Sequence, residues 1–289
     1  MKRQIKAIRA ARRHDIAGLY TRLSLSGTAA DMLDPFLVLA HHGPHDFPPD
    51  SAEPPFDPHP HRGFETVTLI LDGELWHRDS EGNESLIHAG GVQWLTAGAG
   101  VVHSERAPER FWKEGGRFHM LQLWVNLPAR LKMTPPNYQG VEAGALATVP
   151  LQDGSGTVTL ISGKFAGAIG PVASLTGLFM STVSLKAGGH ASLPTPGQRC
   201  VLFYVVNGEV TVGGAKAVAG DLVTFKDGDV IDVEALEEAL IVFGHGDPIG
   251  EPVVTGGPFV MNTEAEIAAA NSDYRAGKFG GLRSAGFPV

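Results

Sequence analysis

Hydrophobic residues along this chain recur in short alternating runs rather than at the spacing of a helix. The runs are rich in β-branched and aromatic residues, and Gly, Pro, Asp or Asn residues interrupt them. This pattern is typical of β-strands joined by turns. The clearest predicted strands cover residues 64–71, 118–126, 158–161, 178–185, 201–206 and 239–243. So many short strands predict an all-β fold, either a sandwich or a barrel.

A helix is predicted near the end of the sequence. Thr263 and Glu266 have the spacing of a capping box, in which each side chain accepts a hydrogen bond from the other residue's backbone N–H group. Helix-forming residues follow from Ile267 to Tyr274, and Gly277 stands where a helix commonly ends. We therefore expect a short C-terminal helix.

Two segments look like copies of one structural unit. Residues 69–75 (LILDGEL) and 204–210 (YVVNGEV) both place a Gly-Glu turn between apolar strands, and an Ala-Gly turn follows each of them. A repeat of this size predicts two similar β-domains rather than a solenoid. Because prolines and a glycine interrupt the pattern between residues 128 and 140, we expect domains over residues 1–140 and 141–250, followed by a tail over residues 251–289.

The composition is that of an ordinary globular protein, with 43% hydrophobic and 19% charged residues. The net charge of −8 argues against a general nucleic-acid-binding surface.

No apolar run approaches the ~18–20 residues that cross a bilayer, so no membrane partner is expected. Residues 1–22 are rich in Lys and Arg but lack the apolar core of a signal peptide. We expect a solvated strand or arm there. The single Cys200 excludes an intramolecular disulfide, and a reducing cytoplasm is the expected compartment.

The segment His59-Pro60-His61 begins a predicted strand that continues through Glu65, Val67 and Leu69. Alternate side chains of a strand share a face, so these residues are expected to point together into the interior. Ionisable groups on an interior face are costly unless a charge or hydrogen bonds satisfy them. A bound cation would satisfy the imidazoles and the carboxylate.

A second pair of candidate ligands, His103 and Glu105, follows a turn that contains Gly98 and Gly100. The pair also shares strand parity. Three imidazoles and one or two carboxylates suit Fe(II), Mn(II), Ni(II), Cu(II) or Zn(II). From the residues alone, Glu65 and Glu105 compete for the fourth ligand position.

The remaining histidines are expected to play smaller parts. We expect solvated loop positions for His41, His42 and His45, surface positions for His77 and His88, and a satisfied core position for His119.

Five segments together resemble the pirin family of the cupin superfamily. They are HPHRGFETVTLILDG from residue 59, HRDSEGN from 77, GGVQWLTAGAGVVHSE from 90, LWVNLP from 123 and GPFVMNTEAEIAAANSDYRAGKFG from 257. The resemblance covers nearly the whole chain and implies a bicupin. Such a protein has two cupin β-barrels packed face to face, a metal in the N-terminal barrel and a C-terminal tail that folds back.

The resemblance also implies a ligand set. The metal ligands of the family fall on His59, His61, His103 and Glu105. Glu65 is then expected to orient a histidine, although the general cupin pattern would make Glu65 itself the ligand.

The second copy has no such ligand set. Superposing Gly208 on Gly73 places Pro194, Pro196 and Cys200 at the positions of His59, His61 and Glu65. One divalent ion per chain is therefore expected, with Fe(II) as the first choice and other transition metals as alternatives.

Three functions are compatible with this centre. The pirin resemblance implies a quercetin 2,3-dioxygenase that cleaves a flavonol with O₂, with Glu105 as the catalytic base. Aromatic residues that could line its pocket are Phe56, Phe64, Trp94 and Trp124. The alternatives are an iron-dependent redox-sensing regulator that binds a transcription factor or metabolic enzyme, and a sugar-phosphate isomerase or similar zinc cupin. A monomer is expected in each case.

Overall fold

The computed structural model describes residues 1–16, 18–28, 31–51, 58–151 and 153–282, which fall into two compact units. The N-terminal unit comprises residues 13–32, 36–143 and the chain from 249 onward. The C-terminal unit comprises residues 1–12, 33–35 and 144–248. The first twelve residues join the C-terminal unit because β1 (Ile5–Ala10) pairs antiparallel with β22 (Asp221–Phe225).

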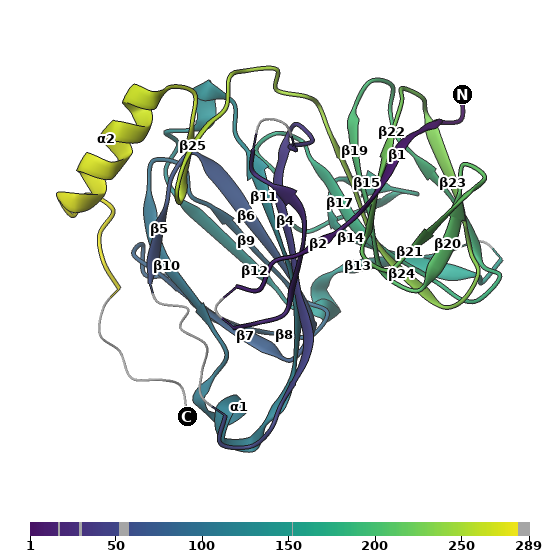
Figure 1. Cartoon of the computed structure of the whole chain (residues 1–289), viewed down its shortest axis with the longest axis horizontal. Helices are drawn as coiled ribbons and strands as arrows, with labels where there is room; N and C mark the ends of the chain where they lie inside the picture. The colour runs from purple at the N-terminus through teal and green to yellow at the C-terminus, as the bar shows by residue number, and fades with distance from the viewer. Residues whose placement is uncertain (17, 29–30, 52–57, 152, 283–289) are drawn as a thin grey trace. The chain divides into compact units, whose positions relative to one another are not determined.

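The N-terminal unit is built from two antiparallel sheets (Figure 1). The seven-stranded sheet has the order β12-β9-β6-β11-β4-β3-β2. Its strands are β2 (Arg12–Arg13), β3 (Thr21–Ser26), β4 (Phe36–Phe47), β6 (Phe64–Asp72), β9 (Val92–Thr96), β11 (Gly116–Asn126) and β12 (Asn137–Val141). The four-stranded sheet has the order β5-β10-β7-β8. Its strands are β5 (His59–His61), β7 (Glu74–Asp79), β8 (Glu84–His88) and β10 (Val101–Arg106).

The C-terminal unit repeats this topology. Its seven-stranded sheet has the order β1-β22-β19-β24-β17-β14-β13, and its four-stranded sheet the order β18-β23-β20-β21. The strands not yet given are β13 (Ala147–Pro150), β14 (Gly156–Ser162), β17 (Phe179–Leu185), β18 (His190–Pro194), β19 (Cys200–Asn207), β20 (Glu209–Val212), β21 (Ala215–Val218), β23 (Val230–Ala235) and β24 (Ala239–Gly246). A two-stranded ribbon, β15 (Lys164–Phe165) with β16 (Ala168–Ile169), lies outside these sheets. The shared strand order confirms the two cupin domains expected from the sequence repeat.

The interiors of the two units differ in chemistry. One apolar cluster fills the C-terminal unit, with members from both sheets such as Phe203, Phe243 and Ile231. In the N-terminal unit, smaller apolar clusters surround buried polar side chains that include His61, His103 and Glu105. The N-terminal unit therefore buries polar side chains beside apolar ones, whereas one apolar cluster fills the C-terminal unit.

The chain crosses from the four-stranded to the seven-stranded sheet between β5 and β6, at Arg62 and Gly63. Gly63 has φ +88°, and a Cβ atom there would lie 2.0 Å from the carbonyl oxygen of Val260. Only glycine fits this conformation and this close approach. The buried Lys132 holds the crossing by donating to the Gly63 oxygen at 2.8 Å, the Val260 oxygen at 3.0 Å and Asn126 Oδ1 at 2.7 Å.

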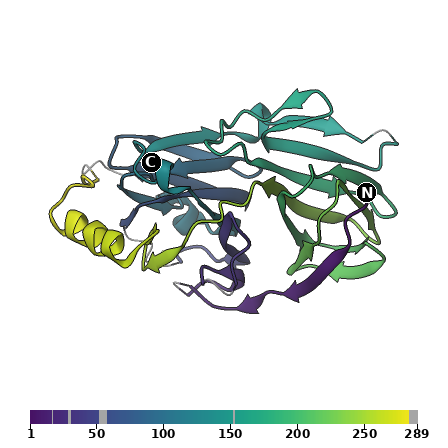
Figure 2. The same ribbon diagram turned by 90° about the horizontal axis from the view of Figure 1, so that it is seen from above.

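The C-terminal segment packs on this crossing within the N-terminal unit. It forms β25 (Val254–Gly256), β26 (Phe259–Met261) and α2 (Glu264–Arg275), which lie together in Figures 1 and 2. One half of the predicted capping box is confirmed, because Thr263 Oγ1 accepts from the backbone N–H of Glu266 at 3.2 Å. The Glu266 carboxylate accepts from the backbone N–H of Asn262 at 3.0 Å, one residue before the expected donor. Arg62 donates to Asp273 of α2 at 2.9 Å, which ties the helix to the end of β5.

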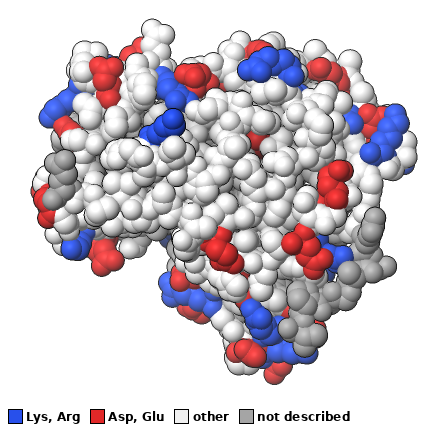
Figure 3. Space-filling model, turned by 180° about the vertical axis from the view of Figure 1, so that it is seen from behind, with Lys and Arg blue, Asp and Glu red and all other residues white. Residues whose placement is uncertain are grey.

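The other helical elements are short, namely α1 (Glu109–Glu114) and the 3₁₀ turns Ala129–Leu131 and Ala143–Ala145. Within the described ranges, neither α-helix has the length and apolar character needed to span a bilayer. On the face drawn in Figure 3, many basic side chains lie next to acidic ones.

We expect Lys132→Met to destabilise the N-terminal unit. The substitution keeps the aliphatic stem but leaves three buried oxygen acceptors unpaired, which should cost about 2–3 kcal/mol. All four tryptophans lie in this unit, so their fluorescence during urea titration follows its unfolding. Lys113→Met is the control, because Lys113 makes a solvent-exposed ion pair with Glu109 that should contribute less than about 0.5 kcal/mol. Equal effects of the two substitutions would contradict this role of Lys132.

Candidate metal centre

Three imidazoles meet where β5 and β10 pair. The antiparallel register puts His59 directly opposite His103, and His61 follows on the same face of β5. The Nε2 atoms of His59 and His103 are 3.1 Å apart, and one ligand nitrogen from each of the three histidines lies within 4.8 Å of the others. The structure thus brings together all three histidines that the sequence singled out.

The donor geometry of this cluster fits a transition-metal ion. Two nitrogens on adjacent positions of an octahedral ion, each bonded at ~2.1 Å, lie about 3.0 Å apart, close to the observed separation of the Nε2 atoms. His61 Nδ1 is 3.2 Å from the Pro258 carbonyl. A carbonyl can only accept, so Nδ1 carries the proton and Nε2 keeps its lone pair for a metal. Pro258 belongs to the C-terminal segment, which therefore orients a candidate ligand.

Burial keeps His61 and His103 in the form that binds metals. Burial, together with the neighbouring His59, lowers the pKa of His61 to about 3. The pKa of His103 is also well below its usual value, first because of burial and then because of His61 and His59. Both rings are neutral near pH 7, and neutral imidazole is the form that binds metals.

Glu105 shares the inner face of β10 with His103, but other side chains hold its carboxylate. Thr68 of β6 donates to Oε1 at 2.8 Å, and Gln122 of β11 donates to Oε2 at 2.7 Å. Glu105 and His59 line one cavity of about 250 Å³. The fourth expected ligand thus borders the centre, while the compact cluster itself consists of the three histidines.

Glu65 lies on the other face of the large sheet, so the expectation that it shares a face with His59 and His61 is wrong. Glu65 lies opposite Thr96 and Val125 in the neighbouring strands, and it accepts a hydrogen bond from Thr96 Oγ1 at 2.7 Å. Strand alternation does not carry across the crossing at Gly63, because β5 and β6 belong to different sheets. Burial raises the pKa of Glu65. Its carboxyl group is bonded by Thr96 on the face of the sheet away from the three histidines.

Several other histidines are more buried than the sequence predicted. His41 and His42 are not in a solvated loop but on β4, with at most 4% of their surface exposed. His42 lines the cavity beside Glu105. His77, expected at the surface, is buried and stacks on Tyr138 at a centroid distance of 3.9 Å. The signal that could have placed His42 was its even spacing from Val38 and Ala40 in one apolar run.

The walls of the cavity are mostly apolar. They are formed by Ile16, Leu23, Val38, Ala40, His42, His59, Glu105, Met120, Gln122 and Trp124. Among the aromatic residues expected there, Trp124 lines the cavity, and Phe64 packs against Trp124 at 4.4 Å between ring centroids. Trp94 lies opposite Val67 on the far face of the sheet, and Phe56 falls outside the described residues. An apolar pocket bordered by a few polar groups is the usual form of a small-molecule site.

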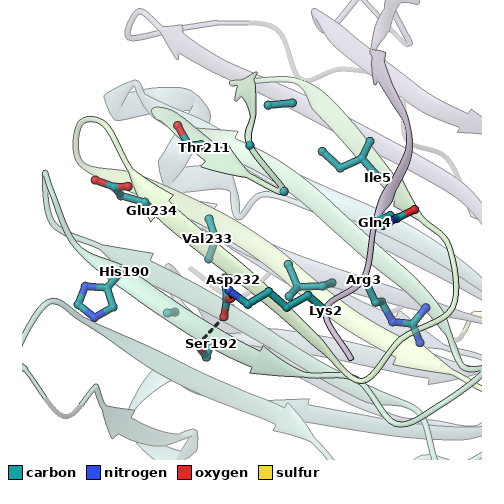
Figure 4. Close-up of a pocket in the computed structure, with 15 residues that line it drawn as sticks. Lys2, Arg3, Gln4, Ile5, His190, Ser192, Thr211, Asp232, Val233 and Glu234 are labelled. Atoms are coloured by element: carbon teal, nitrogen blue, oxygen red, sulfur yellow. Dashed lines mark hydrogen bonds and ion pairs between the residues drawn. The ribbon is translucent and has the colours of Figure 1, made fainter.

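The C-terminal unit offers no comparable cluster among its described residues. Pro194 and Pro196 border a smaller cavity of about 210 Å³ together with His245. A larger hollow of about 930 Å³ lies between residues 2–5 and strands β18, β20 and β23 (Figure 4). Its central carboxylate, Asp232, is already bound by Lys2 at 2.7 Å and Ser192 at 2.6 Å. The larger hollow therefore lacks the convergent, available donors of the histidine centre.

Comparison with known proteins agrees with this architecture. The Pirin family matches residues 18–125, and the family described as Pirin C-terminal cupin domain matches residues 180–280. A pirin-like protein of Caulobacter vibrioides is 40% identical over 281 residues, covering 95% of this chain and 98% of that protein. Pirin-1 of Arabidopsis thaliana is 36% identical over 286 residues, covering 96% of this chain and 94% of that protein.

A solved structure extends the similarity to three dimensions. The crystal structure of a quercetin 2,3-dioxygenase from Acinetobacter baumannii superposes with a TM-score of 0.92 at 34% sequence identity. The alignment covers 98% of this chain and all of that chain (100%). With both cupin domains matched and relatives similar over their full length, the chain belongs to the pirin family.

Proposed function

We propose that this protein is a metal-dependent dioxygenase that opens flavonols such as quercetin with O₂. The observation that carries the proposal is the cluster of three imidazoles, two of them buried, at the edge of an apolar cavity that also contains a carboxyl group. The similarity to the A. baumannii quercetin 2,3-dioxygenase supports the same reaction and substrate class.

In this proposal His59, His61 and His103 hold one divalent ion, and Glu105 supplies the fourth ligand. Fe(II) is the first choice for this ion and other transition metals are the alternatives, since imidazole and carboxylate ligands together suit several of them. When bound, the ion supplies Lewis-acid polarisation of a substrate hydroxyl and redox chemistry toward O₂.

The residues of the cavity prepare the substrate. Glu105 accepts the proton of the flavonol 3-hydroxyl, and Thr68 and Gln122 fix the carboxylate toward the cavity by one hydrogen bond each. The apolar walls, including Trp124 and Met120, exclude water and hold a planar ring system. The enzyme is expected to act as a monomer in the reducing cytoplasm, where Cys200 stays a thiol.

The roles of the two glutamates can be separated by substitution. Glu105→Gln should lower quercetin-dependent O₂ uptake by at least about 100-fold, since an amide cannot accept the substrate proton, and should weaken metal binding. Glu65→Gln is the matched control and should leave both within about twofold, because its carboxyl group lies on the other face of the sheet. Metal content and O₂ consumption are measured for both variants. A loss of metal in Glu65→Gln with retention in Glu105→Gln would contradict the assignment.

The metal content of the protein tests the centre directly. We expect one equivalent per chain, and His61→Ala should reduce it to below about 0.2 equivalents because one of three imidazole donors is lost. Two β-sandwich units retain their cores, so circular dichroism should stay unchanged. His88→Ala removes an exposed imidazole and serves as control. Two equivalents in the unaltered protein would overturn the single-site proposal. Full loading without flavonol-dependent O₂ uptake would favour the iron-dependent regulatory function instead.

A further inference from the structure

His42 is a polar residue of the cavity that neither the ligand set nor the proposed chemistry uses. It lies on β4, and the strand register places it between Thr21 of β3 and Met120 of β11. Its side chain is 4% exposed and lines the same cavity as His59, Glu105 and Trp124. The role of this imidazole depends on which ring nitrogen carries the proton.

The hydrogen bonds around Thr21 decide the tautomer of His42. The Thr21 hydroxyl donates its single proton to the Leu19 carbonyl oxygen at 3.1 Å. The same hydroxyl oxygen is 2.8 Å from His42 Nδ1. The hydroxyl has only one proton, so both contacts are hydrogen bonds at once only when Nδ1 is the donor in this one. The ring has only one proton when neutral, so Nε2 is left with a lone pair.

The ring is neutral at physiological pH. Burial lowers the pKa of His42 to about 4. The cavity therefore contains a fixed, uncharged hydrogen-bond acceptor on a wall that is otherwise formed by side chains such as Val38, Ala40 and Leu23. A ligand group that meets this wall gains a hydrogen bond only if it can donate one.

We propose that His42 is a specificity-determining residue, whose Nε2 atom accepts a hydrogen bond from a ring hydroxyl of the flavonol other than the 3-hydroxyl. Thr21 acts as the positioning residue that fixes the tautomer. This inference rests on the proposed dioxygenase function and narrows its substrate class to flavonols that carry additional phenolic hydroxyls. A site built to pair a substrate hydroxyl discriminates against the analogue that lacks it, because the protein group is then left unpaired.

The test compares two flavonols that differ in these hydroxyls. Quercetin carries several ring hydroxyls, whereas 3-hydroxyflavone has only the 3-hydroxyl. Binding of each is measured without O₂ on the metal-loaded full chain, by quenching of tryptophan fluorescence and by calorimetry, so that no turnover is required. We expect His42→Phe to reduce the preference for quercetin by about tenfold, the effect of one neutral hydrogen bond. His88→Phe, which changes an exposed imidazole of the same unit, should leave the preference unchanged.

Two further variants keep the test decisive. His42→Leu removes both ring nitrogens with a smaller side chain than Phe, so it should lose the preference like His42→Phe and replaces that variant if the latter does not fold. Thr21→Val should reduce the preference without touching the cavity. Long-range ¹⁵N–¹H correlation should show His42 protonated at Nδ1 in the unaltered protein and a mixture of tautomers in Thr21→Val.

The outcomes separate this inference from the proposed function. If the unaltered protein binds quercetin and the His42 variants keep its preference, the assignment of His42 is overturned while the dioxygenase proposal stands. A His42 ring protonated at Nε2 would overturn it as well. An unaltered, metal-loaded protein that binds neither flavonol would overturn both.

Discussion

The candidate centre depends on one constraint, the passage of the chain from one sheet to the other immediately after the first two histidines. The passage needs Gly63, whose positive φ and contact with Val260 exclude a side chain. It also needs Lys132, which bridges the carbonyl groups on both sides of that contact. The C-terminal segment held in this way supplies Pro258, the acceptor for His61. The contacts that hold the backbone at Gly63 therefore also orient a candidate metal ligand.

The interior of the N-terminal unit shows how buried polar groups can be tolerated beside apolar clusters. Neutral imidazoles avoid most of the desolvation cost of burial, and the low pKa values of His61 and His42 reflect this. Glu105 is buried as well, and two neutral donors satisfy one oxygen of its carboxyl group each. The two donors come from β6 and β11 of the seven-stranded sheet, whereas Glu105 lies on β10 of the four-stranded sheet. Both sheets therefore contribute polar groups to this part of the interior.

The C-terminal unit has the same strand order, but its interior is lined by apolar side chains. Its interior is one apolar cluster, and prolines stand where the sequence repeat places His59 and His61. Because the cluster draws on both sheets, this unit can be stable without any bound ion. One copy of the fold thus encloses a single apolar cluster, while the other encloses the candidate site beside its apolar side chains.

The sequence by itself determined many of the strands, the capped C-terminal helix and the pairs His59/His61 and His103/Glu105, because each of these depends on local spacing within one strand or helix. That the two pairs meet depends on the pairing of β5 with β10. Strand alternation correctly paired His103 with Glu105 on one face of β10. The same rule failed for Glu65, since the alternation of side chains holds only within a continuous strand and the chain changes sheets at Gly63. Only the tertiary structure decided that His42 enters the cavity and that Lys132 is buried. Both outcomes depend on partners distant in sequence, namely Thr21 and Val260, which no local pattern identifies.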